Sequence, residues 1–247
     1  MNAWLVRWSP LAIVALAWEL APRMGLVSPA ALPPLSVVLA ALLRLTASGD
    51  LPVNALHSLW RLVAGLGLAI VAGVTLGLLM AWYRPVRIVV EPLVRCIYPM
   101  PKSALIPVLL LWLGLGDLSK IALIFLGSLL PVLLSTFNGV RGLDPMLFWS
   151  ARSLGRRDVA ILVEVALPGA IPDILAGIRT ALALSFILLV SSEFLMSSNG
   201  LGYMISFLGD GGVYDAMFAT VLVVSLLGFA ADRVFLMLMQ RALRWRG

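Results

Sequence analysis

The sequence predicts an all-α polytopic membrane protein with six transmembrane helices. Of its 247 residues, 62% are hydrophobic and only 12% are charged, and the mean hydropathy is +1.05. One soluble domain could not bury so much apolar surface, so we expect the chain to lie in a bilayer. A helix that crosses the hydrocarbon core needs about 20 mostly apolar residues. Six runs, the first weaker than the others, lie at about 9–27, 60–82, 88–113, 119–140, 171–196 and 214–239.

The first run is expected to be a retained span. Arg7 and the apolar residues after it are similar to a signal peptide, but Trp18 and Glu19 stand where a small-residue cleavage site would be. Prolines and glycines break the connection that follows. Its apolar stretch at 37–45 is too short to cross, so we expect an interfacial helix there on the outer face.

The distribution of cations predicts the orientation of the chain. Arg and Lys collect in the cytoplasmic loops of membrane proteins, whereas the stretch at 197–213 holds no cation. Both termini are therefore expected in the cytoplasm, and the net charge of +6 reflects topology rather than a nucleic-acid partner. The segments assigned to the cytoplasm carry Arg7, Arg84, Arg87, Arg141, Arg152, Arg156, Arg157, Arg241, Arg244 and Arg246.

Small residues recur every four positions in the second run, which predicts a packing seam. They lie along one face of a helix and let another backbone approach closely. The alternative is that small residues are simply common in membrane helices, and the pattern does not name a partner. The five residues are Gly65, Ala69, Gly73, Gly77 and Ala81.

The third run contains three prolines around a lysine, in the stretch YPMPKSALIP. Each proline removes an intrahelical hydrogen bond, so the helix is expected to kink or open there. Such breaks often mark a transport pathway. Lys102 could attract an anionic substrate, or it could pair with a carboxylate or reach the surface.

A charged stretch, SARSLGRRDVAILVEVALPGAIP, occupies residues 150–172 between two apolar runs. The spacing of its apolar residues predicts an amphipathic helix over 152–165, with a turn or close contact at Gly155 and an arginine-bearing face. Pro168 and Pro172 are expected to separate this helix from the fifth span. The exposed face suits a soluble partner, although arginines lying on anionic lipid are the alternative.

This stretch resembles a loop known from ATP-binding-cassette (ABC) importers. Gly155 is followed, after nine intervening residues, by Val165, Leu167 and Pro168, which is similar to the EAA loop of their transmembrane subunits. The stretches PMPKSALIPVLLLWLGLGDLSK and SSNGLGYMI resemble the nitrate, sulfonate and taurine permease group. The resemblance covers about residues 29–240 and implies a type I ABC importer permease fold with a cytoplasmic coupling loop at about 141–170.

The resemblance further implies that the loop fits a groove in a separate cytoplasmic ATPase. The family's usual glutamate falls at Trp149, so apolar packing or the neighbouring arginines would have to replace its ionic contact. Neither of the two lysines follows a glycine, so the chain has no phosphate-binding loop for ATP. The residues assigned to this coupling are Trp149, Ser150, Ala151, Arg152, Gly155, Arg156 and Arg157.

By the same resemblance, the chain is a non-catalytic transport subunit that binds no cofactor itself. ATP and Mg would be bound by two cytoplasmic ABC ATPase subunits. A second permease copy, a periplasmic or lipid-anchored solute-binding protein and membrane lipid are the other expected partners. The location implied is the bacterial cytoplasmic (inner) membrane, and the substrate implied is a small anion such as a sulfonate, nitrate or an organic acid.

Polar residues within and beside the spans are candidates for the substrate path. Glu193 could line an outer gate or form a structural pair, and Asn199 lies in an outer turn that could meet a substrate-delivery protein or be a plain turn. The lone His57 and Cys96 provide no metal site. The candidates for the path are Lys102, Ser191, Ser192, Glu193 and Asn199.

Two other function classes predict features that this sequence lacks. A self-sufficient secondary transporter or channel predicts inverted repeats and an ion-coupling carboxylate at mid-membrane, and neither is visible in the sequence. An intramembrane enzyme needs a clustered catalytic constellation. The carboxylates of Glu19, Glu91, Glu193 and Asp232 are instead scattered over different spans.

Overall fold

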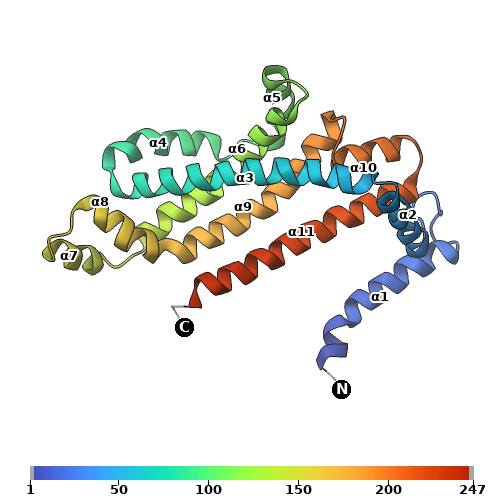
Figure 1. Ribbon diagram of the computed structural model, residues 1–247, viewed down its shortest axis with the longest axis horizontal. Helices are drawn as coiled ribbons and strands as arrows, with labels where there is room; N and C mark the ends of the chain where they lie inside the picture. Colours follow the sequence, from blue (N-terminus) through green and yellow to red (C-terminus); the bar gives the residue numbers. More distant parts are fainter. Residues whose placement is uncertain (1–2, 245–247) are drawn as a thin grey trace. The chain divides into compact units, whose positions relative to one another are not determined.

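The computed structural model describes residues 3–244, and every regular element in that range is helical (Figure 1). The predicted all-α fold class is therefore confirmed. Arg246, one of the arginines used to predict the orientation, lies outside the described residues. The elements are α1 Ala3–Arg23, α2 Leu35–Ala47, α3 Asp50–Trp82, α4 Arg84–Ile97, η1 Lys102–Leu105, α5 Ile106–Leu113, α6 Asp117–Arg141, α7 Pro145–Ser153, α8 Asp158–Ile161, the π-helical turn η2 Leu162–Ala166, α9 Leu167–Met196, α10 Leu201–Asp210 and α11 Tyr214–Ala242.

The chain divides into two compact units. Unit 1 consists of Met1–Ser58 and Glu193–Leu227, and unit 2 consists of Leu59–Ser192 and Gly228–Gly247. The long helices α3, α9 and α11 each contribute to both units.

Four helical stretches in the described part of the chain are long and apolar enough to cross a membrane. They are α3, α6, α11 and the stretch 158–195 that ends in α9. A fifth span results if α4 and the segment 102–113 are counted together, although the two are bent by 92°. This bend lies at the prolines where a break was predicted. The first predicted run, 9–27, overlaps α1, which ends at Arg23, and the count of six spans stays a prediction.

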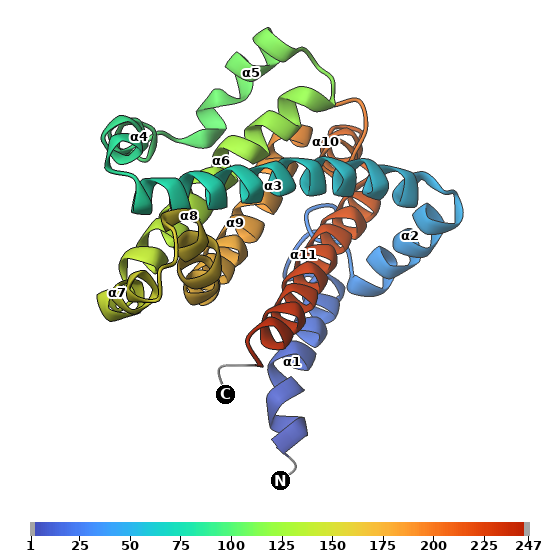
Figure 2. The ribbon, with the colours of Figure 1, turned by 60° about the vertical axis from the view of Figure 1, so that its left-hand side comes forward.

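The predicted seam on α3 packs against α6. A Cβ atom added at Gly65, Gly73 or Gly77 would lie 2.7–2.8 Å from an atom of α6. Side chains at these three positions would therefore force the helices apart. Figures 1 and 2 show α3 crossing α6 in unit 2, and the contacts identify the partner that the sequence left open.

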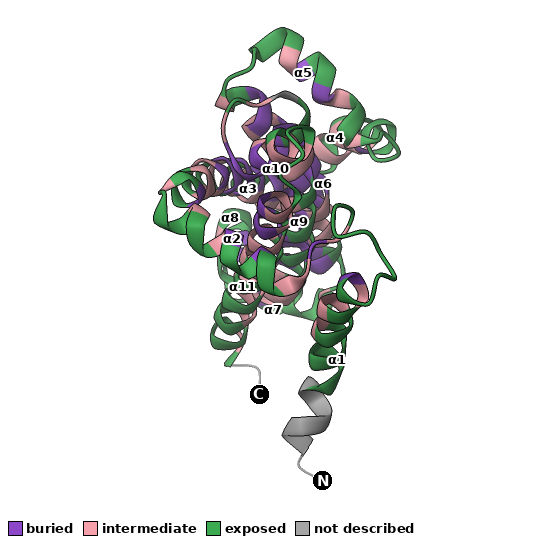
Figure 3. Ribbon diagram, turned by 90° about the vertical axis from the view of Figure 1, so that its right-hand side faces the viewer, coloured by how far each residue is buried: buried purple, intermediate pink, exposed green. Residues whose placement is uncertain are grey.

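Helix α6 also packs closely against α9, so it lies at the centre of unit 2. The position of a Cβ at Gly177 of α9 is 2.5 Å from Ser135 Cβ, and that at Gly139 is 2.7 Å from Asp173 Cβ. Many α6 side chains are buried, as the purple segments of Figure 3 show. Lipid tails are as apolar as these side chains, so close packing rather than water exclusion holds such helices together.

Unit 1 has a separate core made by α2, α10, the start of α3 and part of α11. Buried Leu51, Leu201 and Met204 form one cluster, and Val38 and Ala219 belong to another. The Trp18 ring of α1 meets Phe218 of α11 edge to face, with 6.1 Å between ring centroids. The helix expected at 37–45 is α2, and its residues Val38 and Ala41 are buried in this core.

Candidate functional site

The predicted coupling segment begins with a short helix, α7, whose two ends are determined by local sequence. Asp144 is the N-cap residue, and its carboxylate accepts a hydrogen bond from the Met146 N–H at 2.9 Å. Pro145 occupies the first helical position, where a missing N–H costs nothing. The helix ends because Gly155 adopts a left-handed conformation with φ +76°. Two hydrogen bonds complete a Schellman motif: Gly155 N–H to Arg152 O at 2.9 Å and Arg156 N–H to Ala151 O at 3.1 Å.

The prediction of one amphipathic helix over 152–165 is wrong. The turn at Gly155 separates α7 from α8, so the apolar residues do not share one stripe. Ile161 is fully buried and Leu162 is buried, whereas Leu154 is 83% exposed and Val159 is 64% exposed. Helical periodicity does not continue across Gly155, because its positive φ ends α7.

The expected break between this segment and the fifth span is also absent. Residues 158–195 form one continuous helical stretch through Pro168 and Pro172. A π-helical turn at 162–166 ends two residues before Pro168. Proline cannot donate to a carbonyl one turn earlier, and a π-turn shifts the hydrogen-bond register locally, which lets the helix continue.

Six of the seven residues assigned to coupling are exposed, and Ala151 is buried. The Trp149 side chain, at the position of the family's glutamate, is 60% exposed. Sequence reasoning missed the apolar neighbours Met146 and Leu147, which are also exposed. The sequence does carry a signal for them, because these apolar residues interrupt a polar connection.

The arginines of this segment differ in their partners. Arg152 pairs with Asp158 at 3.4 Å, and Arg156 pairs with Glu164 at 3.5 Å. Both pairs are exposed, so each contributes little to stability. Arg157 has no acidic partner among the described residues, so its charge is available to another chain.

Helix α7 is anchored to the end of α3 through aromatic contacts. The rings of Trp82 and Phe148 meet edge to face at 5.5 Å, and the Arg152 guanidinium lies 5.7 Å from the centre of the Trp82 ring. A cavity of about 460 Å³ between these elements is lined by both rings and by Arg141. A displacement of α7 would therefore reach α3 and α6 directly.

Two of the predicted path residues lie together in unit 2. Lys102 and Ser191 line a cavity of about 290 Å³. The Lys102 ammonium does not pair with a carboxylate as was considered; it donates to Ile97 O at 2.5 Å and Met100 O at 2.8 Å. It thus caps the end of α4, where carbonyl groups lack helical partners. The third residue in this unit, Ser192, is buried and bonds Leu189 O of its own helix at 2.8 Å.

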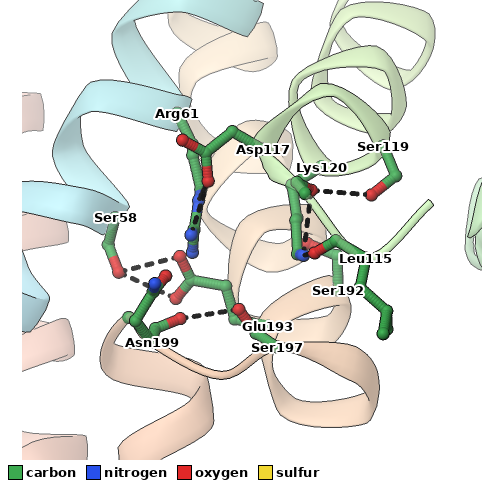
Figure 4. A network of polar contacts seen from close by, with 12 residues as sticks. Ser58, Arg61, Leu115, Asp117, Ser119, Lys120, Ser192, Glu193, Ser197 and Asn199 are labelled. Atoms are coloured by element: carbon green, nitrogen blue, oxygen red, sulfur yellow. Dashed lines mark hydrogen bonds and ion pairs between the residues drawn. The ribbon is translucent and has the colours of Figure 1, made fainter. Parts of the chain in front are cut away.

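The other two path candidates belong to unit 1. Glu193 is fully buried, and its carboxylate accepts hydrogen bonds from the Ser58 hydroxyl (Figure 4). Asn199 accepts a hydrogen bond through its main-chain carbonyl from Ser197 Oγ at 2.6 Å. This geometry favours the structural alternative for Glu193.

Sequence reasoning did not single out Arg61, which has the largest fully buried side chain among the residues that the structure describes. Its guanidinium donates from Nε and from a terminal nitrogen to Asp117 at 2.8 and 2.7 Å. Lys120, on the same turn of α6 as Asp117, donates to the carbonyls of Leu115 and Gly116 (Figure 4). A buried charge needs such partners, but Asp117 lies 56 residues from Arg61 in the sequence, and no sequence pattern identifies the pair.

Arg179 of α9 forms a two-point ion pair with Asp232 of α11, with distances of 2.7 and 3.1 Å. Asp173 packs against Gly139 of α6. Among residues 3–244, no three His, Cys, Asp or Glu side chains gather where they could hold a metal ion.

Comparison with known proteins relates these features to one family. The model of the "Binding-protein-dependent transport system inner membrane component" family matches residues 73–244. The taurine transport system permease protein of Escherichia coli K12 is 31% identical over 242 residues, covering 96% of this chain and 88% of the relative. A putative aliphatic sulfonates transport permease protein of Bacillus subtilis is 34% identical over 238 residues, covering 96% and 86%.

Solved structures show the same fold at low identity. The MetNI methionine ABC transporter in an inward-facing conformation matches with a TM-score of 0.66 and 16% identity, over 76% of this chain and 94% of that one. An amino acid ABC transporter matches with a TM-score of 0.63 and 16% identity, over 82% and 97%. The predicted type I ABC importer permease fold is confirmed. The chain belongs to the binding-protein-dependent transport system inner membrane component family and is a membrane-spanning permease subunit of an ABC importer.

Proposed function

We propose that this permease subunit forms the translocation path for a small anion, with sulfonates as the favoured class. The observation that carries the proposal is the cavity of about 290 Å³ in unit 2. A lysine and two hydroxyl groups can contact an oxyanion, and an aliphatic wall can contact a short carbon chain. The relatives named for taurine and aliphatic sulfonates support this class. The cavity is lined by Lys102, Ser103, Gly127, Leu184, Ile187, Leu188 and Ser191.

Lys102 has two roles in this proposal. Its ammonium lies at the C-terminal end of α4, where the helix dipole favours a cation. Its side chain also lines the cavity, so the same positive charge attracts an anion entering there. Nitrate and organic acids belong to the same chemical class.

Transport is coupled to ATP through α7 and α8, which in this proposal dock onto two cytoplasmic ABC ATPase subunits. Those subunits bind ATP and Mg, and the permease chain binds no cofactor. Exposed Trp149, Arg156 and Arg157 support the docking surface. Nucleotide can shift the equilibrium between the inward- and outward-facing states only by the difference in its binding free energy for the two states. This segment transmits that difference to the membrane helices.

The proposed assembly contains two copies of this chain in the bacterial inner membrane, with both termini cytoplasmic. A periplasmic or lipid-anchored solute-binding protein delivers the substrate at the outer surface, where the cation-free segment 197–213 is assigned. The permease itself catalyses no reaction.

The substrate is tested by uptake into proteoliposomes that contain the complete complex and its solute-binding protein. We expect ATP-dependent uptake of labelled taurine that alkyl sulfonates inhibit. Lys102→Gln should reduce this uptake several-fold, whereas Arg95→Gln, which removes an exposed cation on α4, should not. Another relative is a formylaminopyrimidine transport permease, 31% identical over 187 residues. Saturable uptake of that heteroaromatic compound without any uptake of sulfonate would contradict the anion proposal.

A further inference from the structure

The first backbone N–H groups of α10 donate hydrogen bonds to side chains of two other helices, α3 and α9. The first N–H groups of a helix have no partner within it, and usually the N-cap side chain accepts one of them. The N-cap residue here is a glycine, which has no side chain to do so. The hydrogen bonds run instead from Gly200 N–H to Asn54 Oδ1 at 2.6 Å, from Leu201 N–H to Ser58 Oγ at 2.8 Å and from Gly202 N–H to Glu193 Oε2 at 3.0 Å.

Glu193 is the central group of this arrangement. Its side chain is fully buried, and both of its carboxylate oxygens accept from the Ser58 hydroxyl, at 3.0 and 2.7 Å. The Ser58 oxygen in turn accepts from the first residue of α10. Figure 4 shows the carboxylate turned toward Ser58. A buried carboxylate is costly unless it is hydrogen-bonded, so its position and that of α10 depend on each other.

Gly200 is shaped to admit the carboxylate. Its φ of +107° is one that side-chain-bearing residues rarely adopt, and a Cβ there would lie 2.5 Å from the Glu193 carboxyl group. Any other residue would be strained and would also displace Glu193. The turn and the glutamate therefore form one structural unit.

The other short helix of unit 1 is capped in the same way. The N-cap residue of α2 is Pro34, whose side chain makes no cap hydrogen bond. Glu19, near the end of the preceding α1, accepts from the Ser36 N–H and the Ser36 hydroxyl, both at 2.9 Å. Glu193 likewise lies near the end of α9 and caps the helix that follows. Two glutamates of this chain thus have the same relation to the next helix: Glu19 is half-buried and Glu193 is fully buried.

We propose that Glu193 is a positioning residue: a distal cap that holds α10 and the turn before it in the arrangement that the solute-binding protein requires. The part that concerns docking rests on the proposed function, in which residues 197–213 lie at the outer surface. The carboxylate accepts a hydrogen bond from the backbone of α10, so it acts through the position of that helix. Asn54 and Ser58 complete the cap.

The cap is tested by hydrogen exchange of the amides at 200–204 in the assembled transporter. Glu193→Ala removes the acceptor for Gly202 and should speed exchange roughly tenfold, since a lost buried hydrogen bond of this kind has about that effect. Glu193→Gln keeps an acceptor oxygen and should stay within about threefold of the parent. Ser185→Ala is the matched control, because that buried hydroxyl bonds Leu182 O of its own helix at 2.7 Å. Unchanged exchange in Glu193→Ala would overturn the cap.

If Glu193→Ala fails to assemble, Ser58→Ala tests the same contact more mildly and should speed exchange at Leu201. The docking part is tested by the affinity of the substrate-loaded binding protein for the complex. We expect a loss of at least fivefold in Glu193→Ala and recovery in Glu193→Gln. If hydrogen exchange becomes faster but the affinity for the binding protein is unchanged, the capping role of Glu193 stands and its role in docking is refuted. Failure of ATP-driven uptake in the parent would refute the proposed function instead, because the exchange measurement does not depend on uptake.

Discussion

The seam between α3 and α6 allows a test in which alanine at two glycine positions of one helix should have different effects on the free energy of unfolding. At Gly73 an added Cβ would lie 2.8 Å from Val132 Cβ and 3.1 Å from the Leu133 main-chain nitrogen. These atoms belong to the body of α6, so relief requires the two helices to separate. At Gly67, six residues earlier, an added Cβ would meet no atom within 4 Å.

The difference between the two variants isolates the effect of packing. Alanine favours a helix over glycine by about 0.5–1 kcal/mol, and this gain applies at both positions. Overpacking costs typically about 1–3 kcal/mol, and it applies only at Gly73. We therefore expect Gly73→Ala to lower the free energy of unfolding by about 1–2 kcal/mol and Gly67→Ala to leave it unchanged or raise it. Helix loss during denaturant titration of the purified chain in detergent micelles measures both. Equal stability of the two variants would refute the close approach of α3 and α6.

Three further predictions concern a buried pair, a turn and the topology. Asp117→Asn should destabilise the chain by about 1–3 kcal/mol more than Glu91→Gln. Asp117 is a partner of the buried Arg61, whereas Glu91 pairs with an exposed arginine. Equal losses of stability in unfolding titrations would contradict this prediction. Gly155→Ala should strain the turn after α7 by about 1 kcal/mol and lower ATP-coupled uptake. Gly155→Asn should reduce uptake less, because asparagine tolerates the left-handed region. A greater loss of uptake in Gly155→Asn than in Gly155→Ala would refute the role of the turn. A cysteine at Ser153, in a Cys96→Ser background, should react with a membrane-impermeant maleimide only after cells are permeabilised, and labelling of intact cells would place the segment outside.

Much of the fold was predictable because a bilayer imposes strong rules on sequence. Apolar runs of spanning length coincide with long helices, and the prolines around Lys102 mark the 92° bend. The glycine spacing in α3 predicted a seam. It could not name α6 as the partner, since the facing residues lie about sixty positions further along the chain and glycine spacing carries no information about them.

The errors arose where backbone geometry overrides periodicity. Leu154 and Val159 fit a helical stripe with Ile161, but the positive φ of Gly155 interrupts the helix, and Ile161 is buried whereas the other two are exposed. The continuation through Pro168 depends on a π-turn, which has no clear pattern in sequence. Glu193 illustrates the same limit for function. A carboxylate near a span end is compatible with a gate or with a cap, and the Ser58 hydroxyl that distinguishes them lies 135 residues away.

The central claim is that residues 149–157 link this permease to a separate ATPase, and charge reversal at the two exposed arginines tests it most directly. The measurement is ATP-dependent uptake in proteoliposomes, together with co-purification of the ATPase, for the parent and for Arg156→Glu combined with Arg157→Glu. We predict that the double variant remains folded but loses uptake by at least tenfold and retains less ATPase, because like charges replace complementary ones at the interface. Full uptake by the double variant, or uptake by the permease alone driven by an ion gradient, would contradict the account.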